Sequence, residues 1–235
     1  VLEELGRATD PTPYLATVTQ FAPLAGERYQ AGEAGTALYS GITAHRATDG
    51  WVLSGTARYV LDGDRAEKFA VVTDGGTFVI DAAHAQVTRT EVFDPVLHVT
   101  DVTLADVRVG QNDRVHTDAE RAHHVALMGI SITTVGACQR ALDLVLAHVR
   151  DRYQFGVPIG SFQAVQHKAV DMHVAIERAR ALAYFSALTI SADDPRRRLA
   201  AAMAKAAAGE CQSVVFRHGL QLFGGMGFTW ENDVQ

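Results

Sequence analysis

The pattern of apolar residues changes near residue 113. From Trp51 to Val109, apolar residues form short, β-branched runs separated by turn formers such as Asp62-Gly63-Asp64. Runs with a two-residue period at this spacing are typical of an antiparallel sandwich or barrel. Beyond residue 113 the apolar residues recur at steps of three, four or seven, which predicts helices. The sequence therefore predicts an α+β chain, with a β-rich part followed by an α-helical bundle.

Three long helices are expected in the second part. The first carries the apolar stripe from Met128 to Val149 and opens at Thr117-Asp118-Ala119-Glu120, which fits a capping box. The second carries the stripe from Phe162 to Ala183, and the third opens at Asp194-Pro195, where proline suits the first turn. Three such helices joined by short breaks form the core of a bundle.

The first forty residues are too short to form a domain alone. A short helix is expected over Val1 to Arg7, then a break at Pro11-Thr12-Pro13, then a second helical stretch to Gly26. Such a fragment has too little apolar surface for a core of its own. It is interpreted as the end of a helical domain that is largely absent.

Charge and cysteine content exclude several classes of function. The chain has 21 Lys+Arg and 27 Asp+Glu, a formal net charge of −6, so nucleic-acid binding is not expected. Two cysteines, Cys138 and Cys211, do not make a disulfide scaffold, which favours a reducing, cytoplasmic location. We expect no signal peptide or membrane span, because the apolar stretches are interrupted by Arg, Asp or His and the N-terminus has no basic or apolar leader pattern. No metal site is expected either.

Two segments carry possible chemistry. The first runs from Arg152 to His167 and combines a helix end, a Gly-Pro-Ile-Gly turn and a helix start. Its arginine could hold a phosphate and its Phe155 could cover a base, although an ordinary helix connection has the same pattern. The second, Gln221 to Glu231, contains Gly-Gly-x-Gly, which allows close backbone approach to a ligand but also serves as a helix cap.

Together and in this order, the two segments resemble the C-terminal domain of the acyl-CoA dehydrogenase family. The family pattern is R-x-x-F-G-x-x-I-x-x-F-Q, followed two helices later by Q-x-x-G-G-x-G. The resemblance covers essentially the whole chain. It implies that residues 1–36 are the remnant of an N-terminal helical domain, 37–114 a β-rich middle domain, and 115–235 a C-terminal four-helix-bundle domain.

The resemblance implies an FAD-dependent oxidation of an acyl-CoA thioester to the 2,3-enoyl-CoA. In the family each FAD lies across a subunit interface, so a homologous subunit in a homo- or heterotetramer is expected, with electron-transfer flavoprotein as a further partner. Carried over residue by residue, Arg152 faces the FAD pyrophosphate and Phe155 packs near the adenine. Gln221, Gly224 and Gly225 contact the pyrophosphate through side chain and backbone.

Two flavin-lining elements of the family are altered. Where the family has a T-E-P-x-x-G-S-D loop, this chain has only Tyr39-Ser40-Gly41. Where the family has N-G-x-K-x-W-I-T, this chain reads Ser54 to Leu61, and Leu61 offers no hydroxyl. Tyr59 could still stack on a flavin, but an ordinary half-buried strand tyrosine is an equal interpretation.

The catalytic base is unassigned. Most family members place it beyond the position of Gln235, and others place it on the first long helix, where this chain has Ala126. Glu120 and Glu231 are nearby carboxylates, but helix capping and solvation account for them. Adjacent histidines such as His123 and His124 cannot both face one ligand on a helix.

Three hypotheses remain. The first is a subunit without its own flavin-ring site and base, which contributes the adenosine-diphosphate side of the FAD site to a partner. The second is a self-sufficient homo-oligomeric dehydrogenase whose missing segments lie outside this chain. The third is a non-catalytic structural subunit without FAD. The first is favoured by Tyr59-Val60-Leu61 and Ala126, and a bulky or sterol acyl chain is then the expected substrate class.

Overall fold

The computed structural model describes residues 1–94 and 96–229, and the internal contacts divide the chain into two units. One unit joins residues 1–10 to the chain from Leu127 onward, and the other comprises Pro11–Ala126. The contacts thus assign residues 1–10 to one unit and the rest of the N-terminal segment, from Pro11 onward, to the other. The three-part division after residues 36 and 114, inferred from the family resemblance, stays a prediction.

The N-terminal segment contains the two expected helical stretches. Helix α1 spans Leu2–Arg7, and after the proline break α2 (Tyr14–Ala16), a π-helical turn and α3 (Ala22–Ala25) follow one another. Phe21, Leu24 and Ala25 are buried in a small core with residues of the first sheet described below. This burial explains why a helical stretch of such short pieces is stable.

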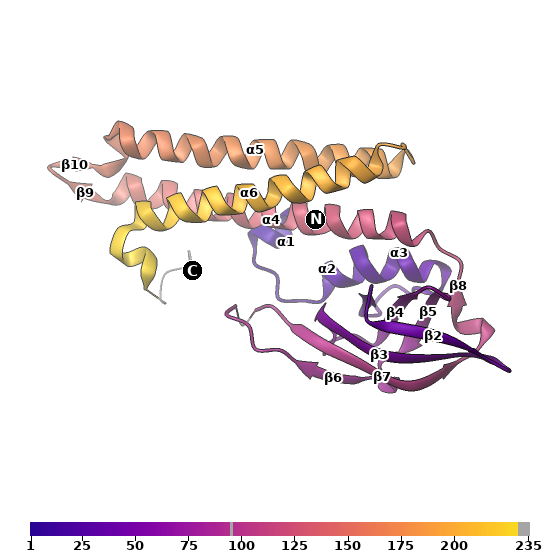
Figure 1. Ribbon diagram of the computed structural model, residues 1–235. Helices are drawn as coiled ribbons and strands as arrows, with labels where there is room; N and C mark the ends of the chain where they lie inside the picture. Colours follow the sequence, from indigo (N-terminus) through magenta and orange to yellow (C-terminus); the bar gives the residue numbers. More distant parts are fainter. Residues whose placement is uncertain (95, 230–235) are drawn as a thin grey trace. The chain divides into compact units, whose positions relative to one another are not determined.

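Two four-stranded sheets form the β unit (Figure 1). The first has the order β1-β4-β5-β8 and the second the order β2-β3-β7-β6. The strands are β1 (Gly35–Leu38), β2 (Ile42–Ala47), β3 (Gly50–Leu61), β4 (Lys68–Thr73), β5 (Gly76–Asp81), β6 (Gln86–Arg89), β7 (Val99–Val109) and β8 (Arg114–Val115). Neighbouring strands pair antiparallel except β1 and β4, which are parallel.

The two sheets share one apolar core. Leu38, Phe69 and Phe78 of the first sheet are buried in the same cluster as Leu53 and Val102 of the second. Alternating strand residues fill such a core from both sides. The expected antiparallel β architecture is confirmed in its sandwich form, because the described strands form two open sheets rather than a closed barrel.

Three long helices follow the two sheets, as expected. They are α4 (Ala119–Asp151), α5 (Gln163–Ser191) and α6 (Arg197–Phe223), and a short hairpin of β9 (Tyr153–Gln154) and β10 (Val157–Pro158) joins the first two. Their apolar stripes meet in one core that includes Val135, Leu142, Met172, Ile176 and Cys211. The described residues therefore contain a helix bundle whose long members agree with the sequence periodicity.

The start of α4 differs from the expected capping box. Asp118, not Thr117, caps the helix, because its Oδ1 accepts a 2.9 Å hydrogen bond from the Arg121 backbone N–H. The Thr117 hydroxyl instead donates to the Leu24 carbonyl at 2.9 Å. Both residue types can cap a helix, and the carbonyl of a distant segment decides which of them does so.

Helix α4 is the one described helix long and apolar enough to pass for a membrane span, with a mean hydropathy of 1.3 in its most apolar window. Half of that window is buried inside the protein. Val135, Leu142 and Val145 on this helix belong to the core of the bundle. The apolar character of α4 is therefore that of a core helix.

Candidate functional site

The hairpin after α4 contains a turn of unusual composition. Gln154 pairs with Val157, and Phe155 and Gly156 form the two-residue loop between them, with φ angles of 55° and 80°. Positive φ at both central positions defines a type I′ turn, which normally uses Asn-Gly or Gly-Gly. A phenylalanine in the left-handed region is strained by about 1 to 3 kcal/mol.

Phe155 is also the most exposed large apolar side chain of the hairpin, at 91%. Among the described residues, its ring contact is an edge-on approach to Phe162, with the centroids 6.2 Å apart. Figure 1 shows the hairpin projecting beyond the ends of the helices. A strained backbone that holds an aromatic ring in water has no internal structural benefit, which points to a ligand or partner that covers the ring.

Arg152 lies at the base of the same hairpin. Its backbone is fixed on both sides, since its N–H donates to the His148 carbonyl at 2.9 Å and its carbonyl accepts from Ile159 N–H at 2.8 Å. Its side chain is exposed and makes no hydrogen bond or ion pair with any described residue. The guanidinium is thus available to an anionic ligand, and its role at a phosphate stays a prediction.

The Gly-Gly segment lies at the end of α6. Gly224 terminates the helix with a φ of 65°, a conformation that favours glycine. Gly225 has no such requirement, and a Cβ at either position would meet no described atom within 4 Å. Backbone packing therefore does not explain Gly225, and the open space at its Cα would allow a ligand to approach closely.

Gln221 is held in place by a residue that sequence reasoning missed. Lys168 Nζ, near the start of α5, donates to Gln221 Oε1 at 2.8 Å. The amide oxygen is thereby occupied, and the amide nitrogen points its donors elsewhere. No sequence signal marks this pair, which is 53 positions apart.

A ring contact joins the two segments. His148, in the last turn of α4, lies against Phe223 at the end of α6, with the ring centroids 4.6 Å apart. Burial, reinforced by the neighbouring charge of Arg152, lowers the pKa of His148. The structure therefore brings the base of the hairpin and the Gln221 to Gly225 segment to the same end of the bundle.

In the β unit, the segment that replaces the flavin loop is a tight connection. Three residues, Tyr39-Ser40-Gly41, join β1 to β2, and Gly41 has a φ of 85°. A Cβ at Gly41 would lie 2.2 Å from the Thr56 carbonyl oxygen. The backbone at Gly41 packs so closely on β3 that the three-residue connection forms a tight turn and not an extended loop.

Tyr59 is not an ordinary strand tyrosine. It has a φ of 57° at an irregularity in the pairing of β3 with β7, and its side chain is 74% exposed. A bulge in a strand redirects the side chain that it carries. The structure thus turns the Tyr59 ring outward, where it could face a planar ligand, while Leu61 stays partly buried.

Within the described residues, the positions considered for the catalytic base carry no buried carboxylate. Ala126, at the position where some family members carry the base, is buried, and a methyl group offers no proton acceptor. Glu120 is exposed and lies 4.0 Å from His124. Glu231 lies outside the described residues. Tyr39 contacts His123 edge-on, which gives that histidine a packing role.

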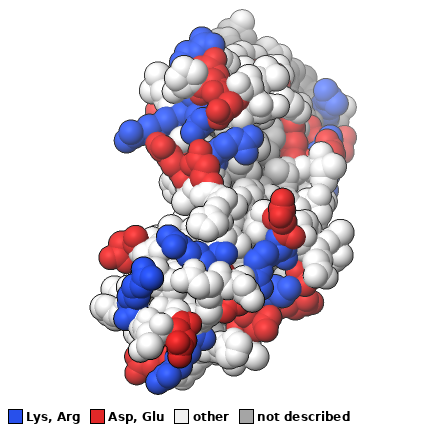
Figure 2. All heavy atoms as spheres, turned by 90° about the vertical axis from the view of Figure 1, so that its right-hand side faces the viewer, with Lys and Arg blue, Asp and Glu red and all other residues white. Residues whose placement is uncertain are grey.

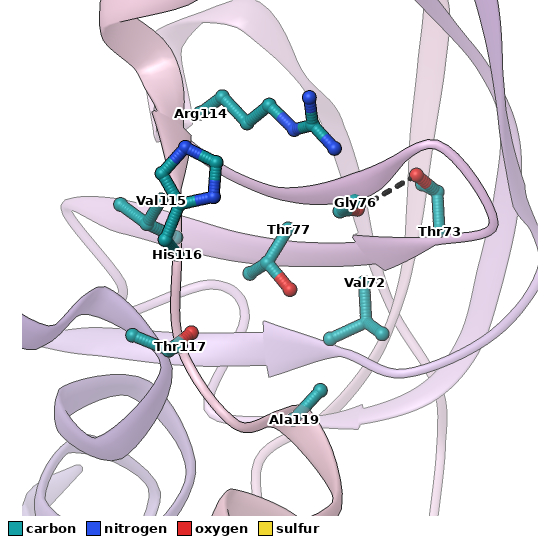
Figure 3. Close-up of a pocket in the computed structure, with 9 residues that line it drawn as sticks. All are labelled: Val72, Thr73, Gly76, Thr77, Arg114, Val115, His116, Thr117 and Ala119. Carbon is teal, nitrogen blue, oxygen red and sulfur yellow. Dashed lines mark hydrogen bonds between the residues drawn. The ribbon is translucent and has the colours of Figure 1, made fainter.

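A separate pocket of about 440 Å³ lies in the β unit beside the β4–β5 turn (Figure 3). Arg114 and His116 of the segment before α4 line it, together with Thr73, whose hydroxyl donates to the Gly76 carbonyl at 2.8 Å. The Arg114 guanidinium lies over the Trp51 ring at 5.5 Å. This stacking is a sufficient structural reason for the arginine.

Charge is mixed on one face of the protein. On the face drawn in Figure 2, Lys and Arg side chains alternate with Asp and Glu side chains without a large field of one sign. Among the described residues, no group of three or more His, Cys, Asp or Glu side chains is arranged to hold a metal ion. Because the formal net charge is −6, an anionic ligand would have to be bound by local donors such as Arg152 rather than by the overall charge.

The chain is similar to known proteins in both sequence and fold. The family model described as "Acyl-CoA dehydrogenase, C-terminal domain" matches residues 119–235. The protein "Acyl-CoA dehydrogenase IpdE2" of Mycolicibacterium smegmatis is 34% identical over 240 residues, which covers 100% of this chain and 68% of the relative. The protein of the same name from Mycobacterium tuberculosis is 34% identical over 235 residues, covering 100% and 67%.

Solved structures share the fold. The ChsE4-ChsE5 complex from Mycobacterium tuberculosis superposes with a TM-score of 0.88 at 24% identity, over 97% of this chain and 70% of that chain. A variant of the Tcur3481-Tcur3483 steroid ACAD gives a TM-score of 0.84 at 26% identity, over 99% and 71%. The two motifs quoted from the sequence thus lie in a fold that solved dehydrogenase structures share.

Proposed function

Because the chain belongs to the acyl-CoA dehydrogenase family, we propose that it is one subunit of an FAD-dependent enzyme that dehydrogenates an acyl-CoA thioester between Cα and Cβ. In this proposal the chain contributes the adenosine-diphosphate side of an interfacial FAD site. A homologous partner subunit holds the flavin ring and the catalytic base. The residues contributed by this chain are Arg152, Phe155, Gln221, Gly224 and Gly225.

The observation that carries the proposal is the conformation of Phe155. Its left-handed backbone costs stability, and its ring is 91% exposed in this chain. An adenine packed on the ring would recover the contact that the isolated chain lacks, since stacked aromatic pairs contribute about 0.5 to 1.5 kcal/mol beyond burial. Arg152, which has no side-chain partner among the described residues, lies at the base of the same hairpin and would hold the phosphates.

The donor set fits a pyrophosphate. A guanidinium offers two parallel N–H groups to phosphate oxygens, and Arg152 has no competing partner among the described residues. Lys168 donates to the side-chain oxygen of Gln221, which directs the amide N–H groups of Gln221 away from Lys168 and leaves them for the phosphates. Gly224 and Gly225 leave space above the backbone, so that peptide groups can approach the phosphates.

Two further observations support assigning the ring and base to a partner. The connection Tyr39-Ser40-Gly41 is too short to form the loop that lines the flavin in the family. Ala126 supplies no carboxylate at the alternative position of the base. Removal of the thioester Cα proton needs a positioned base. The described residues have no buried carboxylate at the Tyr39-Ser40-Gly41 connection or at Ala126.

In the reaction, FAD supplies the hydride-accepting chemistry when it is bound. The residues of this chain bind and orient. Arg152 would neutralise part of the diphosphate charge and Gln221 would donate hydrogen bonds to it, while Phe155 would shield one face of the adenine from water. Their contribution is to position the reacting group, because correct orientation removes much of the entropic part of the barrier.

A self-sufficient homo-oligomeric dehydrogenase is the second candidate. Tyr59 favours it, since the outward ring at a bulge of β3 could stack on a flavin bound to this chain. In that case the base and the missing flavin contacts would come from segments outside this chain. A structural subunit without FAD is a third outcome, in which Phe155 and Arg152 would contact a protein surface instead.

We extend the proposal to substrate, acceptor and location. The similarity to a steroid ACAD at 26% identity supports a bulky acyl-CoA, such as one with a sterol-derived chain. Electron-transfer flavoprotein is the proposed electron acceptor. A cytoplasmic location fits two free cysteines, which are both buried in the helical core.

The three candidates differ in where flavin is retained. The full-length protein is purified alone and together with its homologous partner, and the flavin absorbance of both preparations is recorded. Flavin only in the joint preparation supports the partner-dependent site. Flavin in the preparation of this protein alone overturns the partner-dependent site in favour of the self-sufficient enzyme. Colourless protein in both preparations overturns both of these and leaves the structural subunit.

A further inference from the structure

Two buried thiols meet in the core of the helix bundle. Cys138 of α4 and Cys211 of α6 are both fully buried and belong to the same apolar cluster. Their sulfurs lie within hydrogen-bonding distance, with the Cys138 S–H as the donor and the Cys211 sulfur as the acceptor. These are the two cysteines of the chain, and they are far apart along the sequence. The fold therefore brings both thiols of the chain to one point.

Small side chains surround the thiol pair. On α6, Ala207 and Ala208 come one turn before Cys211, and on α4, Ala141 comes one turn after Cys138. Residues one turn apart share a helix face, and all three alanines are buried. Side chains of this size let two helices pack at the short end of the usual distances between helix axes. A disulfide needs Cα atoms about 4.4 to 6.8 Å apart, a separation that such close packing allows.

The two thiols differ in acidity. The hydrogen bond to Cys211 raises the pKa of Cys138, and burial raises it further. The same hydrogen bond lowers the pKa of Cys211, with burial opposing it and the charges of Arg178 and Arg180 reinforcing it. Because the thiolate is the reactive form of cysteine, Cys211 is the thiol that reacts first with an oxidant. Cys138 then lies in place to react with the product.

We propose that Cys138 and Cys211 form a reversible oxidation site, at which a peroxide converts the two thiols into a disulfide between α4 and α6. The Cys211 thiolate attacks one oxygen of hydrogen peroxide and the O–O bond breaks. The departing hydroxide takes up the thiol proton as water, and a sulfenic acid remains on Cys211. The Cys138 sulfur then displaces the sulfenic oxygen as a second water, and the S–S bond forms. The two thiols lose two electrons and two protons, and the peroxide takes up both.

The disulfide staples the first long helix of the bundle to the last. It closes a loop of about 70 residues, which removes conformational entropy from the unfolded chain and so stabilises the fold. In a reducing compartment such a bond is transient, which makes it a response to oxidant and not a permanent scaffold. Hydrogen peroxide is close to water in size, so brief local opening of the helices admits it to the core. The site goes beyond the proposed function and does not depend on FAD.

Peptide mapping tests the bond directly. The full-length protein in its native assembly is treated with hydrogen peroxide, then unfolded, alkylated and digested with trypsin. Mass spectrometry should find the peptides 122–140 and 206–217 linked to each other, and dithiothreitol should separate them. Untreated protein should give both peptides alkylated. Unlinked peptides from peroxide-treated, folded wild type, or sulfonic acids as the main product, would refute the proposal.

Single variants test the order of the two steps. Cys138→Ser should stop at a sulfenic acid on Cys211, which dimedone traps. Cys211→Ser should oxidise at Cys138 about tenfold more slowly than Cys138→Ser does at Cys211, because less thiolate is present. Equal rates in the two variants would contradict the assignment of Cys211 as the first thiol to react.

Thermal unfolding tests the staple. The melting temperature of the peroxide-treated wild type should rise by roughly 5 °C and return to its starting value after reduction. The double variant Cys138→Ala/Cys211→Ala is the control, because peroxide oxidises its methionines but cannot form the bond. Its melting temperature should not rise. Linked wild-type protein that melts no higher than the reduced form would overturn the staple.

Discussion

Lys168 Nζ donates a 2.8 Å hydrogen bond to Gln221 Oε1, which ties the start of α5 to the last turn of α6. The bond orients the Gln221 amide, so that its N–H groups face away from Lys168. We expect Lys168→Met to weaken FAD retention in the assembled complex about fivefold, corresponding to about 1 kcal/mol for one hydrogen bond. Equilibrium dialysis of the flavin measures this.

The matched control is Lys205→Met on α6, an exposed lysine outside the Gln221 to Gly225 segment and the hairpin. Both variants should unfold within about 0.5 kcal/mol of the wild type, because surface substitutions have small effects on stability. Equal FAD retention in the two variants would show that Lys168 does not position Gln221.

Arg152→Ala should weaken FAD retention more strongly than the lysine variant does. Hydrogen bonds to a charged group contribute about 1.5 to 3 kcal/mol, which predicts a loss of roughly 10- to 150-fold. Arg152→Lys should fall between, because it keeps the charge and loses the two-pronged geometry. Arg150→Ala, two positions earlier and also exposed, is the control. Unchanged retention in Arg152→Ala would remove this residue from the FAD site.

The fold was predictable where the burial of periodic apolar residues decides the structure. The apolar periods of two residues and of three to four residues correctly predict the β sandwich and the three long helices. The prediction of a capping box at Thr117 was wrong. The Thr117 hydroxyl donates instead to the carbonyl of Leu24, which is remote in sequence. The left-handed Phe155 was not predictable either, since local preference opposes it and only the pairing of β9 with β10 imposes it.

The strain at Phe155 predicts opposite effects on stability and binding. Asn tolerates the left-handed region, so Phe155→Asn should relieve about 1 to 3 kcal/mol of strain while losing the partly exposed contact with Phe162. We expect a melting temperature about 2 to 4 °C higher, for a net gain near 1 kcal/mol. FAD retention should fall at the same time.

Tyr153→Asn is the control for this variant, because it removes an exposed aromatic side chain from the same hairpin at a residue without positive φ. It should give no increase in melting temperature. A Phe155→Asn protein that is no more stable than Tyr153→Asn would mean that the turn is not strained.

The pKa of His148 predicts how stability depends on pH. Burial and the charge of Arg152 lower this pKa below its usual value of about 6.5 in the folded protein. As the pH falls below 6.5, the unfolded chain takes up the proton first, so stability decreases until the pH is below the folded pKa. Burial also lowers the pKa of His218, which adds to the same trend.

Thermal unfolding between pH 8 and pH 5 tests this sign. His148→Phe keeps the ring contact with Phe223 and removes the titrating group, so its melting temperature should fall less on acidification than that of the wild type. His167→Phe, at an exposed position of α5, is the comparison. A steeper fall in His148→Phe would contradict the assigned direction.

Two helical glycines predict opposite results for the same substitution. A Cβ at Gly136 of α4 would lie 1.9 Å from the Glu3 carbonyl oxygen, whereas a Cβ at Gly209 of α6 would meet nothing within 4 Å. Gly136→Ala should push α1 off α4 and cost about 1 to 3 kcal/mol, as overpacking does. Gly209→Ala should gain about 0.5 to 1 kcal/mol from helix propensity. Urea unfolding followed by circular dichroism measures both. Stabilisation by both substitutions would show that α1 does not pack closely on α4 in solution.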